Sequence, residues 1–137
     1  MAFDYILDQF GKNRHRNTRF TDVERRAKEA ISCFVAHQID DEAMFNKMLE
    51  IQKEYGSLLE HDGQTTIDED TPLWMNSFFG FSFKKWAEFQ AIKKHFAAHP
   101  EKLVGEMKAR YQAICSMGYD RDFMDACITV VNNTSGE

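Results

Sequence analysis

Residues 41–60, DEAMFNKMLEIQKEYGSLLE, form the most regular pattern in the chain and decide its fold class. Apolar side chains recur there every three or four residues and fall within about 100° of one helix face. They are Met44, Met48, Ile51, Tyr55, Leu58 and Leu59. The opposite side carries the acidic residues Glu42, Glu50, Glu54 and Glu60. The pattern predicts a long amphipathic helix, with Asp40 or Asp41 as its N-cap.

Helical spacing also precedes this segment. We expect a short helix over residues 2–10 and a longer one that begins at Thr21 and ends near Val35. The longer one starts with Thr21-Asp22-Val23-Glu24, which matches a capping box, in which the Thr hydroxyl and the Glu carboxylate satisfy amides at the helix start. The sequence therefore predicts one helix before and one helix after the basic stretch over residues 12–19.

Four further helices are expected after residue 70. Thr71-Pro72 starts a helix, since Pro suits the first helical position, and Gly80 interrupts it. Ser82 then caps a helix that runs to about residue 98. The next helix has an expected inward face of Leu103, Val104, Met107, Tyr111, Ile114 and Cys115. Gly118 ends it in the left-handed conformation, and a last helix covers roughly 120–131.

No segment alternates with a period of two for long enough to predict a strand. We therefore expect an all-α fold, a single compact domain over 1–137 built as an irregular helical bundle of six or seven helices. Three stretches are expected outside the helices: a basic loop over 12–19, an acidic loop over 61–70 and a polar tail over 132–137.

Composition is consistent with one ordinary core. The chain has 137 residues, 43% of them hydrophobic, and 12 Phe, 4 Tyr and 2 Trp supply more apolar area than disordered chains carry. No apolar run approaches the length of a membrane helix, and the first residues lack the pattern of a signal peptide. We therefore expect a cytoplasmic protein without membrane contacts, whose cysteines, Cys33, Cys115 and Cys127, are reduced thiols.

Aromatic residues crowd into residues 74–89. We expect Trp74, Phe78, Phe79, Phe81 and Trp86 to bind a protein partner, because Trp and Phe are common interface anchors. The alternative is that this segment forms the centre of the core.

Charge is segregated along a chain whose net charge is −5. Residues 40–70 contain ten Asp and Glu against two Lys, whereas residues 71–110 contain seven Lys and Arg against three Glu. In size and acidity the chain resembles small phage-encoded inhibitors of restriction or CRISPR systems. That resemblance implies that carboxylates on a helix, here Glu42, Glu50, Glu54 and Glu60, would occupy a basic groove that normally takes nucleic acid. The alternative is a solvated acidic face.

The basic stretch gives a second candidate for nucleic acid. Lys12, Arg14, Arg16 and Arg19 could contact phosphates, although a solvated loop explains them equally. The overall acidity opposes a long nucleic-acid track.

Catalytic and metal motifs are lacking in the sequence. It has no phosphate-binding glycine loop and no nucleophile elbow. Cys33 and His37, like His95 and His99, are four residues apart, but neither pair belongs to a recognised zinc pattern. The leading hypothesis is a non-enzymatic interaction or regulatory protein without cofactor, metal or catalytic residues, binding a protein partner or a second copy of itself.

Overall fold

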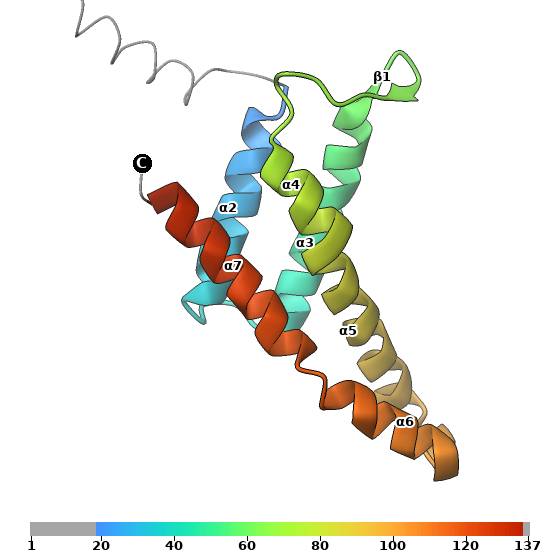
Figure 1. Ribbon diagram of the computed structural model, residues 1–137. Coiled ribbons are helices and arrows are strands. Elements are labelled where there is room, and N and C mark those ends of the chain that lie inside the picture. Colours follow the sequence, from blue (N-terminus) through green and yellow to red (C-terminus); the bar gives the residue numbers. More distant parts are fainter. Residues whose placement is uncertain (1–18, 136–137) are drawn as a thin grey trace, which may run out of the picture.

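The computed structural model describes residues 19–135, and its order of elements confirms the all-α prediction (Figure 1). The helices are α2 (Thr21–Val35), α3 (Asp41–Leu59), α4 (Leu73–Ser77), α5 (Phe83–Ala98), α6 (Gly105–Cys115) and α7 (Tyr119–Ser135). A π-helical turn, Phe78–Ser82, joins α4 to α5, and a 3-10 turn, Pro100–Lys102, precedes α6. The helix expected over 2–10 lies outside the described residues.

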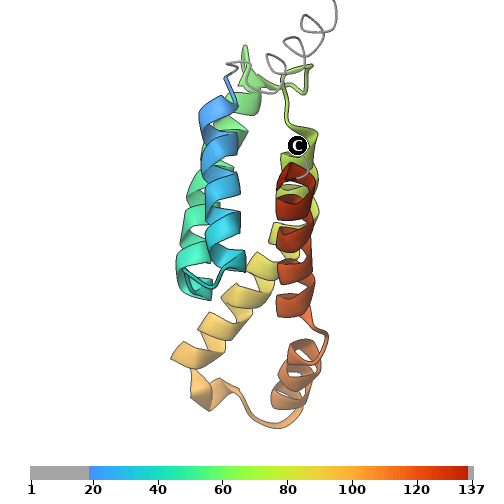
Figure 2. The same ribbon diagram turned by 90° about the vertical axis from the view of Figure 1, so that its left-hand side faces the viewer.

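Four long helices, rather than the six or seven expected, dominate the described fold. They are α2, α3, α5 and α7, with 15, 19, 16 and 17 residues, whereas α4 and α6 have 5 and 11. Helix α2 packs against both α3 and α7, and α5 packs against α7 (Figure 2). None of the described helices is long and apolar enough to cross a membrane.

Gly80 does not interrupt the helix, contrary to our prediction. It lies inside the π-helical turn, so the helical path continues from Leu73 to Ala98 without a break. Ser82 makes no side-chain capping hydrogen bond there. A π turn adds a residue to one helical turn without opening a loop, which periodicity alone could not indicate.

Of the helix starts predicted at Thr21 and at Asp40, the structure confirms the one at Asp40. Asp40 is the N-cap of α3, and its carboxylate accepts a hydrogen bond of 2.8 Å from the Ala43 amide. The capping box at Thr21 is wrong, because α2 already begins at Thr21 with Phe20 in the N-cap position. The Glu24 carboxylate instead accepts a hydrogen bond from the Trp74 indole.

The stretch 61–70, expected to be a loop, contains all of a small hairpin except its first residue, Glu60. Strands β1 (Glu60–His61) and β2 (Gln64–Thr65) pair antiparallel. Between them Asp62 and Gly63 both have positive φ, 57° and 81°. This is the geometry of a two-residue hairpin turn, for which Asp-Gly is a favoured sequence. The signal was present in the sequence, but the strands are too short to show alternation.

Two C-terminal expectations are also wrong. The stretch 132–135 of the expected polar tail belongs to α7, while 136–137 lies outside the described residues. Helix α6 buries no residue: Val104 and Met107 of its expected inward face are 64% and 48% exposed, and Cys115 is exposed. Leu103, Tyr111 and Ile114 of this face are half-buried, and Tyr111 contacts Phe96 of α5, so the face is only partly covered.

The core is built around aromatic rings from four segments. Phe123 of α7 stacks on Trp86 of α5 with ring centroids 4.1 Å apart and an interplanar angle of 8°. The same ring lies 5.6 Å from Phe34 of α2 and 5.6 Å from Phe78 of the π turn. The apolar face predicted for α3 completes this core with Met44, Met48, Ile51 and Tyr55, all buried.

Replacing Phe123 by Ala tests this centre. We expect Phe123→Ala to lower the free energy of unfolding by about 3–5 kcal/mol, because it leaves a cavity between four packed segments. Urea unfolding followed by circular dichroism measures the loss. Phe81→Ala is the control: Phe81 is 62% exposed, so its replacement should cost less than about 1 kcal/mol. Equal losses of unfolding free energy in Phe123→Ala and Phe81→Ala would contradict the assignment of Phe123 to the centre of the core.

Candidate docking surfaces

Most of the aromatic block is core rather than surface. Phe78, Phe79 and Trp86 are only 3%, 4% and 1% exposed. Phe78 and Phe79 contact each other, and the rings of Phe78 and Trp86 both contact Phe123. The expectation that these three side chains contact a partner is therefore wrong for this conformation, and the alternative of a central core segment describes them.

Trp74 and Phe81 remain nearer the surface. Trp74 is half-buried, and its indole Nε1 donates a hydrogen bond of 2.6 Å to Glu24, which fixes α4 against α2. Phe81 is exposed, with the Lys85 ammonium 4.2 Å from its ring centroid. Of the predicted set, Phe81 alone presents most of its ring to solvent, and it offers too small a surface for a docking site by itself.

The acidic face predicted on α3 is exposed. Glu42, Glu50, Glu54 and Glu60 all lie on the surface. Glu54 is partly neutralised, because Arg26 of α2 donates a hydrogen bond of 2.6 Å to its carboxylate. The other three form no ion pair within the described part of the chain. They carry the excess negative charge here, although Glu50 shares a pocket with Lys47 and Glu60 belongs to β1 rather than to α3.

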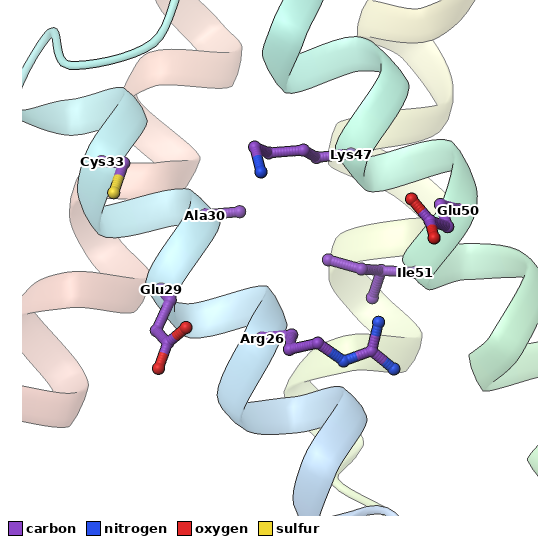
Figure 3. A pocket seen from close by; sticks show the side chains of 7 residues that line it. All are labelled: Arg26, Glu29, Ala30, Cys33, Lys47, Glu50 and Ile51. Carbon is purple, nitrogen blue, oxygen red and sulfur yellow. The ribbon is translucent and has the colours of Figure 1, made fainter.

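A pocket of about 330 Å³ lies between α2 and α3 (Figure 3). Lys47 reaches from α3 toward α2, where Ala30 and Cys33 face it. Arg26 at its other end is held by Asp22 and Glu54. Glu29 and Glu50 balance the two cations. Because the charges cancel, the pocket favours neither anions nor cations.

Arg19 has a structural role that its sequence context did not reveal. Its guanidinium donates hydrogen bonds to Asp68, at 2.7 Å, and to the Leu58 carbonyl, at 3.2 Å. It also lies 4.4 Å from the Phe20 ring centroid. The Arg19 hydrogen bond lowers the pKa of Asp68. Arg19 thus ties the chain just before α2 to the last turn of α3 and to the loop after β2, whereas Lys12, Arg14 and Arg16 lie outside the described residues.

Sequence reasoning missed the largest candidate surface, which we call the distal arm: residues 90–118. No residue of this range is buried. In both views the second half of α5 and all of α6 extend beyond the ends of α2 and α3 (Figures 1 and 2). Val104, Met107 and Met117 are exposed apolar side chains on it. Their spacing suggested burial, so only the three-dimensional arrangement reveals them.

One aromatic contact lies within the arm, and another joins the two positions where the chain leaves and re-enters the core. Tyr111 of α6 lies 5.1 Å from Phe96 of α5 between ring centroids, and Tyr119 lies 5.4 Å from Phe89. Gly105 and Gly118 bound α6 with positive φ, 56° and 82°, which side chains with a Cβ rarely adopt. The arm therefore has a fixed start and end but little packing between them.

Asp120 ties the base of the arm to α5. Its carboxylate accepts hydrogen bonds from Trp86 Nε1 at 2.8 Å, Gln90 Nε2 at 3.0 Å and Lys93 Nζ at 3.3 Å. Nearby, partial burial and the Asp120 charge raise the pKa of Asp41. This cluster sets the direction in which α5 leaves the core.

A groove of about 640 Å³ lies where the start of α3 faces the end of α5. Phe45 and Ala98 are among its apolar side chains, and Glu42 and Lys94 among its charged ones. The groove connects the acidic face of α3 with the distal arm. It is open and contains charges of both signs, so it suits a contact between protein surfaces better than a small-molecule site.

The potential metal ligands do not come together. Cys33 and His37 lie near the end of α2, while His95 and His99 line the groove at the end of α5. Among the residues whose side chains are described (19–60 and 62–133), no group of three or more His, Cys, Asp or Glu is placed to hold a metal ion. No set of side chains there supports a specific catalytic step.

Thiol labelling tests whether Cys127 is buried in the core and Cys115 is exposed. Burial raises the pKa of Cys127 to about 12, so its thiol stays protonated and unreactive well above neutral pH. In the folded chain at about pH 8 we expect a disulfide reagent to label exposed Cys115 first and Cys127 only after unfolding. Cys115→Ser removes the fast phase and serves as the control. Rapid labelling of Cys127 in that folded variant would contradict this core.

Comparison with known proteins adds no relative. The chain matches no family model, no characterised protein and no solved structure. The geometry gives three exposed features: the acidic face of α3, the groove beside it and the distal arm. A function has to be argued from the chemistry of these surfaces.

Proposed function

We propose that the protein is a non-enzymatic protein–protein interaction protein whose docking surface is the distal arm. One observation supports this most directly: residues 90–118 bury no side chain, although the sequence of α6 has an apolar face. Helix α6 has 11 residues, and isolated helices shorter than about 12–15 residues are marginal in water. A partner that covers α6 would stabilise it.

The arm's charge indicates the chemistry of that partner. Residues 90–118 contain five Lys and Arg against two Glu. Glu106 pairs with Arg110 at 2.9 Å, and Glu101 lies 3.3 Å from His99. Lys94, Lys102 and Lys108 have no ion partner in the described part of the chain. The complementary partner is an acidic protein surface with an apolar centre.

Photo-crosslinking tests the arm as the docking surface. A photoreactive amino acid replaces Met107, and the matched control replaces Ser32, which is exposed on α2. In an extract of the source organism we expect one major adduct from position 107 and none from 32. Lys102→Glu with Lys108→Glu should reduce its yield at least about fivefold, since the charge no longer matches.

The charge-reversed variant must stay folded if its lower adduct yield is to report on binding. Because neither lysine is buried, we expect their replacement to change the free energy of unfolding by less than about 1 kcal/mol. Equal adducts at positions 107 and 32, or an adduct that tolerates charge reversal, would refute the arm as the docking surface.

The uncompensated carboxylates on α3 favour a second candidate, an inhibitor that occupies a basic groove normally filled by nucleic acid. Glu42 and Glu50 lie on one rigid helix without ion partners among the described residues. Binding to a basic partner should then compete with duplex DNA and weaken steeply when both become Lys, as a competition assay would measure. Competition that survives Glu42→Lys with Glu50→Lys would exclude this candidate. Glu29→Lys, on α2, is the control.

A further inference from the structure

An open surface, which we call the α4–α5 face, follows the helical path from α4 into α5 (Figure 1). It consists of exposed residues at intervals of three or four positions, which places them on one side of a helix: Leu73, Ser77, Gly80, Phe81, Lys84 and Lys85. Leu73 and Phe81 are 66% and 62% exposed. Lys84 and Lys85 form no ion pair among the described residues. The face is therefore apolar at its start and basic at its end.

Gly80 lies in the middle of this face, although the described fold does not require a glycine there. Its φ is not positive, and a Cβ built on it would meet no described atom within 4 Å. Glycine is less favourable than alanine in a helix, because its backbone loses more freedom on folding. What a glycine provides at an exposed helix position is room for another backbone to approach closely. Gly80 therefore suits a second helix packed directly on the α4–α5 face.

The chain itself contains a segment that complements this face. Residues 2–10 lie outside the described part of the chain, but their sequence predicts a short helix. Its apolar residues have the spacing i, i+3, i+4 and i+7 of one helix face, and they are Phe3, Ile6, Leu7 and Phe10. Asp4 and Asp8, four residues apart, are the charged residues of this segment. The segment is therefore apolar and acidic, whereas the α4–α5 face is apolar and basic.

Arg19, the first described residue, lies beside the loop that leads into α4. Its guanidinium is 2.7 Å from the Asp68 carboxylate and 4.0 Å from that of Asp70. Residues 12–18 add three further cations and no acid, while residues 68–70 are all acidic. Opposite charges therefore direct the chain that precedes Arg19 toward the start of α4.

The length of the connecting chain also fits. Phe10 precedes Arg19 by nine residues, which gives a reach of up to roughly 30 Å. Leu73 and Phe81 are only about 12 Å apart along the helical path, and Phe3 and Phe10 would be about 10 Å apart along a helix. The apolar ends of the segment and of the face therefore match in spacing.

We propose that residues 2–10 form a helix that docks on the α4–α5 face of their own chain, antiparallel to α4 and to the start of α5. In this arrangement Phe10 lies near Leu73, Phe3 lies near Phe81, and Asp4 faces the two lysines that follow. The segment is then an internal cover for this face, which an external acidic amphipathic helix would have to displace. The contact is separate from the distal arm and does not rest on the proposed function.

Photo-crosslinking within the purified full chain gives the first test. A photoreactive amino acid replaces Ser77, and the matched control replaces Ser32, which is an exposed serine of α2. Peptide mapping should join position 77 to residues 2–10 of the same chain, at a yield at least about fivefold above that from position 32, because docking raises the local concentration. A lower ratio or an adduct with another segment refutes the proposal. An adduct that migrates as a dimer also refutes it, since a second copy would then occupy the face.

Charge exchange gives the decisive test. Lys84→Glu with Lys85→Glu should lower the yield from position 77 at least about fivefold, because like charges then face each other. Adding Asp4→Lys and Asp8→Lys to that variant should restore at least about half of the yield, since the charges are complementary again. A yield that tolerates the first exchange, or one that the second exchange does not restore, overturns the proposal.

The control pair separates this contact from general charge effects and from the distal arm. Lys102→Glu with Lys108→Glu changes two exposed lysines of the arm by the same amount, and it should leave the yield from position 77 within about twofold. A larger loss in this control would show that the yield follows net charge rather than the α4–α5 face, and would contradict the proposal.

Discussion

The ring of Phe123 is the contact on which the rest of the fold depends. It stacks on Trp86 of α5 at 4.1 Å and lies 5.6 Å from both Phe34 of α2 and Phe78 of the π turn. One side chain of α7 thus joins the helices on both sides of the molecule. The hydrogen bond from Trp86 to Asp120 fixes the same pair of helices at the edge of the stack. Together these contacts set where α5 and α7 lie relative to α2.

This arrangement also determines which surface is left uncovered. Phe89 is the last buried residue of α5, and the helix continues to Ala98 beyond the reach of the core. The chain must then return to Tyr119 to begin α7, and α6 lies on that return path. Because α2 and α3 do not extend to this point (Figure 2), α6 contacts the end of α5, through Tyr111 and Phe96, and buries no residue. The distal arm is therefore a consequence of how the core is closed.

The sequence pattern predicted those features of the fold that the residues of a single helix determine. The apolar face of α3 and the Asp40 cap were predicted because spacing and a side-chain acceptor determine them. Periodicity reports which side of a helix is apolar but not what covers it. For this reason the sequence left open whether the aromatic block binds a partner or forms the core, in which its centre is buried, and α6 was assigned to the core although none of its residues is buried. The π turn at Gly80 depends on packing across helices and has no local pattern.

Charge segregation was visible in the sequence, but its meaning depends on the fold. Opposite charges on neighbouring segments usually neutralise each other within a domain, as Arg26 and Glu54 do across α2 and α3. Here the end of α5 faces the start of α3 across a groove, with Lys94 and Glu42 in its lining, whereas α6 extends beyond the ends of α2 and α3 (Figure 1). An excess charge that the fold keeps apart remains available for intermolecular contact. In the proposed function, the lysines of the arm that have no ion partner among the described residues are the charges available for that contact.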